Sequence, residues 1–281
     1  MRHNFTVQIG PITYRVASVW PQPIAALANL YRHYPAGDGI ADYSVRLEPD
    51  RWWRRRLRPS IAIRGDYMLP DALPLPLAQG LLAAEMGMNL QLALGERRFL
   101  LLHAASVERD GRALILTGES GSGKSTLSAL LGATGWRFMG DEFVLIDSDS
   151  GSIHPFPRPV SLKNASISIL EAMLARDRFG PLLRSTPKGD IRHLRPDGSA
   201  LASMFRTAAP HLIVFPRFGF DAAVRDVPPG EVFVRLTHAS TNYTAMGERG
   251  FVALSRLVTT TAAKAIDYPD TQTALDLIAA L

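Results

Sequence analysis

The sequence predicts an α/β fold in which a small strand-rich N-terminal module, residues 1–72, precedes a larger domain, residues 73–281. Two observations support this division. Up to about residue 72, short segments of alternating apolar and polar residues are separated by Pro, Gly and Asp, which is typical of strands joined by turns. From residue 99 onward, apolar runs of strand length alternate with segments of helical periodicity, which is typical of an α/β domain.

The composition excludes several classes of protein. Apolar residues make up 47% of the 281 residues and charged residues 20%, which is ordinary for a globular protein and excludes a disordered chain. Cysteine is absent, which excludes disulfides, cysteine zinc sites, iron–sulfur clusters and thiol nucleophiles. The 31 Lys and Arg against 26 Asp and Glu give a net charge of +5, which suits an anionic ligand as well as a nucleic acid.

No segment of the sequence has the pattern of a targeting or membrane-spanning segment. The first residues, MRHNFTVQIG, contain no continuous apolar run of the kind that signal peptides carry. Prolines and polar side chains interrupt the most apolar stretch, residues 73–94, whereas a membrane span needs about 20 apolar residues. We therefore expect a cytoplasmic protein with no membrane partner, and a buried helix within residues 73–94 that ends at Gly95.

The other elements follow from the spacing of apolar residues and turn residues. In the N-terminal module we expect strands within Thr6–Arg15 and Tyr43–Leu47. Phe99–Glu108 and Ala113–Thr117 are expected to form a hairpin, because Asp110-Gly111 suits a tight turn. Helices are expected at 124–134, 165–176 and 271–280, and further strands at 137–139, 143–147, 211–215 and 232–237.

A glycine-rich loop carries the strongest functional signal. Residues 118–125, GESGSGKS, match G-x-x-x-x-G-K-[ST] between an apolar strand and an apolar-periodic helix. Glycine lets the backbone curl and present its N–H groups to phosphate oxygens, and the helix N-terminus adds partial positive charge. Lys124 is placed to reach the β- and γ-phosphates, and the Ser125 hydroxyl to ligate magnesium. The predicted nucleotide-binding residues are Gly118, Glu119, Ser120, Gly121, Ser122, Gly123, Lys124, Ser125 and Thr126.

Acidic residues downstream of this loop compete for the base and metal roles. The sequence lacks the N-K-x-D motif of GTPases and the signature of transporter ATPases, and it is short for a helicase. Asp141 and Glu142 follow a short strand, 17 residues after Lys124. Asp147 ends the apolar run FVLID, as the acid of a Walker B strand would. The residues SDSG that follow it have a turn composition, which favours a turn role for Asp147.

These residues together resemble the core of the bacterial HPr kinase/phosphorylases. In that family a histidine precedes the first glycine of the loop by 15 residues, as His103 does here, and an acidic pair follows the lysine by 17, as Asp141 and Glu142 do. The resemblance covers residues 99–147 well. Asn242-Tyr243 and the segments TPKG at 186–189 and IRHLRP at 191–196 make the subgroup of HPr-related kinases the most similar.

The resemblance implies a phosphoenolpyruvate-carboxykinase-like nucleotide fold and an ATP- and magnesium-dependent kinase. The expected acceptor is a hydroxyl, a serine of a protein or peptide. Lys124, His103 and Asp141 become the catalytic residues, with Asp141 as general base; Ser125 and Glu142 become the metal ligands. Glu142 stands where the family has Asp, and Asp190-Ile191-Arg192-His193 only echoes the family signature Glu-Ile-Arg-Gly. The rings of that family make a homo-oligomer an expectation.

Several alternatives stay open from the sequence alone. A small-molecule kinase would keep Lys124 and Asp141 with another acceptor, and an ATP-binding scaffold would transfer no phosphate; the presence of Asp141 favours an enzyme. His103 has the alternative role of a strand histidine satisfied by a backbone carbonyl. The Asn242-Tyr243 pair is consistent with nucleotide binding or with a buried tyrosine.

Two basic segments also have alternative interpretations. Lys188, Arg192, His193 and Arg195 either close over phosphates or form a solvated loop. The run RWWRRRLR at residues 51–58 interleaves aromatic and cationic side chains, as some nucleic-acid surfaces do, but a solvated strand edge or an internal contact is favoured. We therefore do not expect a nucleic-acid partner.

Overall fold

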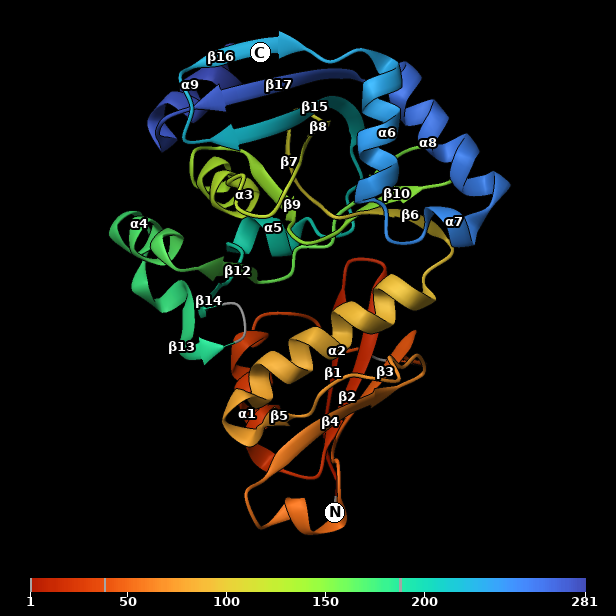
Figure 1. Cartoon of the computed structure of the whole chain (residues 1–281), viewed down its shortest axis with the longest axis vertical. Coiled ribbons are helices and arrows are strands. Elements are labelled where there is room, and N and C mark those ends of the chain that lie inside the picture. The colour runs from red at the N-terminus through yellow and green to blue at the C-terminus, as the bar shows by residue number, and fades with distance from the viewer. Residues whose placement is uncertain (1, 38, 187–188) are drawn as a thin grey trace.

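The computed structural model describes residues 2–37, 39–186 and 189–281 and shows a mixed α/β fold with several sheets (Figure 1). The N-terminal part is a five-stranded sheet of order β1-β2-β3-β4-β5, against which two helices pack. Its elements are β1 His3–Ile9, β2 Ile12–Ser18, α1 Pro21–Leu30, β3 Tyr43–Pro49, η1 Trp52–Arg55, β4 Ser60–Gly65, β5 Leu75–Pro76, η2 Leu77–Gln79 and α2 Gly80–Gly95.

Of the two strands expected in the N-terminal module, one is a hairpin in the structure and the other is confirmed. The segment Thr6–Arg15 is a hairpin, because Gly10 with φ +53° turns the chain between β1 and β2. The strand expected at Tyr43–Leu47 is confirmed as part of β3, which pairs parallel with β2 after the crossover helix α1. No helix was expected at α1.

Helix α2 is the predicted apolar helix, and it ends at Gly95 as expected. It packs against β3 and β4, with Gly87 so close that an added Cβ would lie 2.6 Å from Val45 Cγ1. Figure 1 shows α2 on the side of the N-terminal sheet that faces the rest of the chain. The division of the chain after residue 72 stays a prediction; α2, which it assigns to the second part, packs on the sheet of the first.

The rest of the chain is built around a six-stranded sheet of order β16-β17-β15-β8-β7-β9, in which β8, β15 and β17 are parallel. Two three-stranded sheets, β11-β10-β6 and β12-β14-β13, accompany it. The elements are β6 Phe99–Leu102, β7 Ala104–Arg109, β8 Arg112–Thr117, α3 Lys124–Ala133, β9 Arg137–Gly140, β10 Val144–Asp147, β11 Ile153–His154, β12 Val160–Lys163, α4 Ala165–Met173, η3 Arg176–Arg178, β13 Phe179–Thr186, β14 Gly189–Leu194, α5 Gly198–Ala202, β15 Ala209–Phe218, β16 Ala223–Asp226, α6 Pro229–Ala239, α7 Tyr243–Met246, α8 Glu248–Thr260, β17 Ala262–Tyr268 and α9 Thr271–Ala279.

Two apolar cores cover the faces of the six-stranded sheet. Side chains of α3 and α9 fill one core, and side chains of α6, α8 and β10 fill the other. The predicted helices at α3, α4 and α9 and the predicted strands at β8, β9, β10 and β15 are confirmed. The segment Phe99–Glu108 splits at His103, so that β6 and β7 belong to different sheets.

The strand expected at Val232–Thr237 is wrong, because this segment belongs to helix α6. A strand would bury Val232, Val234 and Leu236 on one face, whereas the structure buries Val232 and Leu236 and exposes Val234. Pro229 occupies the first helical position, where its fixed φ favours a helix. Among the residues described, no helix is both long and apolar enough to cross a bilayer.

Candidate active site

The glycine-rich loop joins the end of β8, an inner strand of the six-stranded sheet, to the first turn of α3. Gly118, Gly121 and Gly123 have φ of +155°, +87° and +95°, so the loop uses backbone conformations that favour glycine. Gly123 also lies against β17, where an added Cβ would be 2.1 Å from the Tyr268 hydroxyl oxygen. That hydroxyl donates a 2.7 Å hydrogen bond to the Ser122 carbonyl, so β17 supports the loop from outside.

Lys124 is the first residue of α3, and its side chain folds back over the loop. Its Nζ donates to the carbonyl oxygens of Gly118 and Glu119, at 2.7 Å and 2.8 Å. Burial lowers the pKa of Lys124, and the carboxylates of Asp141 and Glu142 act in the opposite direction. The ammonium is thus held by backbone carbonyls in the concave side of the loop, near two carboxylates.

Asp141 follows β9 and is 3% exposed. Its Oδ1 accepts a 3.1 Å hydrogen bond from Ser125 Oγ, on the first turn of α3. Its Oδ2 is buried and has no hydrogen-bond partner among the described residues. Burial, and secondly the charge of Glu142, raise the pKa of Asp141 to about 7. The structure therefore brings together the predicted acid and the predicted hydroxyl ligand.

Glu142 and His103 meet beside this pair. Glu142 has φ +73°, a left-handed conformation that is uncommon for a residue with a side chain. Its Oε2 lies 3.6 Å from His103 Nδ1. His103 occupies the break between β6 and β7. Its backbone N–H donates to the Ala239 carbonyl at 2.7 Å, and its side chain is 49% exposed. Partial burial lowers the pKa of His103, and the charge of Glu142 opposes that shift.

A cavity of about 640 Å³ joins these side chains: His103, Lys124, Ser125, Asp141 and Glu142 all line it. Ser120, Gly121, Gly123 and Thr126 line it as well, while Gly118, Glu119 and Ser122 line an adjoining hollow of about 990 Å³. The predicted catalytic, nucleotide-binding and metal-binding residues thus lie around two neighbouring hollows at one end of the central strands.

The donor set here fits a magnesium ion shared with a nucleotide. Within residues 2–37, 39–186 and 189–281, no group of three or more His, Asp or Glu side chains is arranged to hold a metal by itself. Magnesium is commonly bound by one or two protein oxygens together with substrate phosphates and water. The Ser125 hydroxyl and the Glu142 carboxylate supply oxygens of this kind in one cavity.

Lys163 and Ser161 of β12 were missed by sequence reasoning. Both line the same cavity, and the charge of Lys163 helps to lower the pKa of Lys124 and of His103. Tyr268 was missed too, although it contacts the loop. No sequence motif marks these residues, because strand pairing brings β12 and β17 to the site from far along the chain.

The basic residues of β14, and Arg195 directly after it, do not line this cavity. Arg192 pairs with Glu171 of α4 and donates to the Gly180 carbonyl, and Arg195 donates to carbonyls of α1. His193 is buried. For these three residues the alternative of a solvated loop is wrong, because they lie on β14 or directly after it, with His193 buried and both arginines bonded to other parts of the chain. Lys188 lies outside the described residues.

Asn242 and Asp147 have structural roles. The buried amide of Asn242 accepts from the Leu101 N–H and donates to the carbonyls of Glu96 and Phe99, so it fixes the start of β6. The side chain of Asp147 accepts from the N–H groups of Asp149 and Ser150 and closes a turn. The turn interpretation of Asp147 is thus confirmed.

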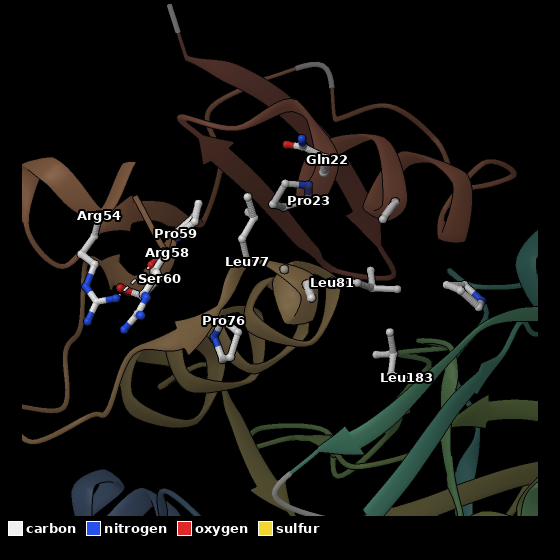
Figure 2. Close-up of a pocket in the computed structure, with 14 residues that line it drawn as sticks. Gln22, Pro23, Arg54, Arg58, Pro59, Ser60, Pro76, Leu77, Leu81 and Leu183 are labelled. Carbon is white, nitrogen blue, oxygen red and sulfur yellow. Dashed lines mark hydrogen bonds between the residues drawn. The ribbon is translucent and has the colours of Figure 1, made fainter. Parts of the chain in front are cut away.

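A hollow of about 830 Å³ between the N-terminal part and β13 lies apart from the glycine-rich loop (Figure 2). Prolines and leucines form half of its described lining, and Arg54 and Arg58 of the basic run lie at one end. No carboxylate or histidine is found in its described lining, so it offers no base for chemistry at a hydroxyl. Trp52 of the same run is 83% exposed.

Comparison with known proteins gives a distant likeness. No protein-family model and no curated protein sequence matches the chain. Among solved structures, the chain is similar to the HPr(Ser) kinase/phosphatase from Coxiella burnetii, with 14% sequence identity and a TM-score of 0.29. The similarity covers 63% of this chain and 90% of that chain.

Proposed function

We propose that this protein is an ATP- and magnesium-dependent kinase that transfers the γ-phosphoryl group to a hydroxyl. The observation that carries the proposal is the pairing of Ser125 with Asp141 at 3.1 Å, beside Lys124 and in one cavity with His103 and Glu142. Phosphoryl transfer needs positioning and neutralisation of charge more than covalent help from the protein. A cradle of glycine N–H groups, one ammonium and one free carboxylate oxygen match those needs.

The residues take separate roles in this proposal. The loop and the N-terminus of α3 bind the phosphates, and Lys124 exchanges its carbonyl partners for oxygens of the β- and γ-phosphates. Ser125 and Glu142 hold the metal ion, which when bound neutralises charge on the phosphates. His103, tied to Glu142, faces the same space. The contact with Ser125 orients Asp141, whose Oδ2 is left for the acceptor.

The transfer step is a single displacement. The acceptor oxygen forms a bond to the γ-phosphorus while the bond from that phosphorus to the β,γ-bridging oxygen breaks, and ADP leaves. The proton of the acceptor hydroxyl passes to Asp141 Oδ2, so the products are a phosphate monoester and ADP. For this chain, the resemblance to the HPr kinase/phosphorylases predicts a serine of a protein or peptide as the acceptor. Cytoplasmic location and homo-oligomer formation also stay predictions.

Mass spectrometry tests the proposal directly. The purified chain is incubated with MgATP and candidate hydroxyl acceptors, and intact masses are recorded for a gain of one phosphoryl group together with ADP release. Gain of that mass with the wild type and its loss with Asp141→Asn supports the proposal. A chain that binds no ATP, or an Asp141→Asn variant as fast as the wild type, overturns it. ATP binding without transfer to any acceptor favours the scaffold alternative.

A further inference from the structure

A second, smaller cavity of about 100 Å³ adjoins the candidate active site on the side of the N-terminal part. Helix α2, the segment before β12, β12 itself and β14 enclose it. Asp141, Glu142, Ser161 and Lys163 line both this cavity and the larger one beside the glycine-rich loop. Asp141, the proposed base, therefore lies where the space for the nucleotide adjoins a smaller space beside α2.

Three buried polar atoms around this small cavity lack partners among the described residues: Glu85 Oε1, His193 Nδ1 and Asp141 Oδ2. Glu85 is 5% exposed and His193 2%, so bulk water does not satisfy them. Buried polar groups without hydrogen bonds are uncommon and cost free energy, so their clustering points to a polar occupant.

The charges decide which polar occupant fits. Arg158 already uses four of its five N–H donors, on Tyr31 Oη, Asn89 Oδ1 and a carbonyl and a carboxylate oxygen of Glu85. Among the described lining residues, the carboxylates of Glu85, Asp141 and Glu142 face the cations of Arg158 and Lys163. The unpartnered carboxylate oxygens of Glu85 and Asp141 favour an uncharged or cationic ligand that donates hydrogen bonds over a phosphate or carboxylate ligand.

The size of the cavity restricts the ligand further. A cavity of about 100 Å³ has room for several water molecules or for one small organic molecule. A small organic fragment fits that space, whereas a folded segment of a protein does not. The walls of the cavity are also held together, because a buried ion pair joins α2 to the segment before β12, with Arg158 Nη2 2.6 Å from Glu85 Oε2.

We propose that this cavity is the acceptor site, and that the acceptor is a small polyol or amino alcohol rather than a serine within a protein chain. Its reacting hydroxyl donates to Asp141 Oδ2, and a second hydroxyl or an ammonium group donates to Glu85 Oε1. The transfer step is the displacement given above, so this inference rests on the proposed kinase function. It replaces the protein acceptor that the sequence led us to expect.

Ligand-observed NMR tests the cavity without any need for turnover. Saturation transfer to ethanolamine and to glycerol is measured with the wild type and with Lys124→Ala, which keeps the cavity but loses a phosphate contact. Glu85→Gln removes the charged acceptor, so we expect about 10- to 100-fold weaker binding of the better probe. Glu231→Gln, the same change at a half-buried glutamate of α6 that also pairs with an arginine, is the control and should bind as the wild type does.

Met86→Trp provides a second route if Glu85→Gln does not fold. Met86 lines the cavity, is 43% exposed and takes no part in the ion pair, so a larger side chain there fills the space from its mouth. Probe binding should disappear in this variant while ATP binding is kept.

The outcomes separate this inference from the proposed function. Binding of a probe that falls in Glu85→Gln and Met86→Trp supports the acceptor site, whether or not ATP binds. No binding of either probe, or equal binding to all variants, overturns it and leaves water as the occupant. Phosphorylation of dephosphorylated casein that Met86→Trp does not slow also overturns it, while the kinase proposal stands. Failure of the wild type to bind ATP overturns the kinase proposal and the acceptor role of the cavity with it, although binding of a probe would still show a ligand site.

Discussion

Ser125 and Asp141, which lie 16 residues apart in the sequence, are joined by a hydrogen bond of 3.1 Å from Ser125 Oγ to Asp141 Oδ1. This contact fixes the acid that follows β9 against the first turn of α3. One oxygen of the carboxylate is thereby oriented and the other is left free in the cavity. Variants of the loop and of the acids test what this arrangement does.

Lys124→Ala should weaken MgATP binding about 10- to 100-fold, because it removes a charged donor to the phosphates. Calorimetry on both proteins measures the change. Lys264→Ala is a matched control, since Lys264 pairs with Asp226 at 2.7 Å on β16 and does not line the cavities of the site. Equal affinity of the wild type and Lys124→Ala would mean that the loop is not the phosphate site.

Asp141→Asn should slow transfer by roughly 10²- to 10⁴-fold while ATP still binds, because a positioned general base contributes about that factor. Asp147→Asn should leave the transfer rate near that of the wild type, since Asp147 closes a turn and does not line the cavity. Single-turnover rates for the two variants decide between them. A slow Asp147 variant beside a fast Asp141 variant would reverse the assignment.

The stability difference between the wild type and Asp147→Asn should depend on pH. Hydrogen bonds from the Ser150 N–H and hydroxyl and from the Asp149 N–H lower the pKa of Asp147 in the folded state. A lowered folded pKa stabilises the fold above the unfolded pKa of about 3.9, and this contribution is lost as pH falls through the folded value. Urea titrations should show a difference of about 1 kcal/mol at pH 7 that shrinks below pH ~4. A difference that grows on acidification contradicts this role.

Gly123→Ala should abolish ATP binding, because a Cβ would lie 2.1 Å from Tyr268 Oη in a backbone with φ +95°. The next nearest atom, Tyr268 Cζ, is at 3.4 Å, an ordinary contact. The double variant Gly123→Ala/Tyr268→Phe should therefore recover part of the affinity. Gly111→Ala is the control for backbone strain alone, because φ is +78° there and no atom lies near the added Cβ. We expect it to lower the free energy of unfolding by about 1–2 kcal/mol. Identical calorimetric affinities of the single and double variants would exclude the clash.

Arg158→Met and Glu85→Met should each destabilise the fold by about 3–5 kcal/mol, because each leaves the partner charge buried and unpaired. The double variant should lose less than the sum of the two single variants. Urea unfolding of the four proteins gives the coupling free energy. Additive losses would show that the pair does not hold α2 to the rest of the chain.

Local sequence patterns predicted those elements whose periodicity is unambiguous. The glycine-rich loop between a strand and a helix was found, because its residue types follow from phosphate geometry. The turn at Asp147 was found from the turn composition of the residues that follow it. Val232–Thr237 was misassigned because so short a mixed run of apolar and polar residues fits a strand and a helix equally well, and the burial that decides between them comes from the tertiary structure.

The parts of the site that could not be predicted depend on pairing between distant segments. Lys163 and Tyr268 reach the cavity on β12 and β17, whose neighbours in space are not their neighbours in sequence. Glu85 was expected in an apolar helix, and nothing in that helix indicates a partner 73 residues away at Arg158. A charged residue in an apolar helix is a weak signal that becomes informative once the partner is known.

The support that Tyr268 gives to Ser122 affects how the chain folds during synthesis. The two residues are 146 positions apart, and β15 and β17 complete the sheet around β8 from the C-terminal side. At about 5–20 residues per second, Ser122 is made roughly 7–30 s before its partner. Through that interval the apolar strand β8 lacks its parallel neighbour β15 for much of the time, and parallel pairing is slow to form. A nascent chain of this protein therefore presents an open edge at β8 until β15 has been made, and an unsupported nucleotide loop until β17 has been made.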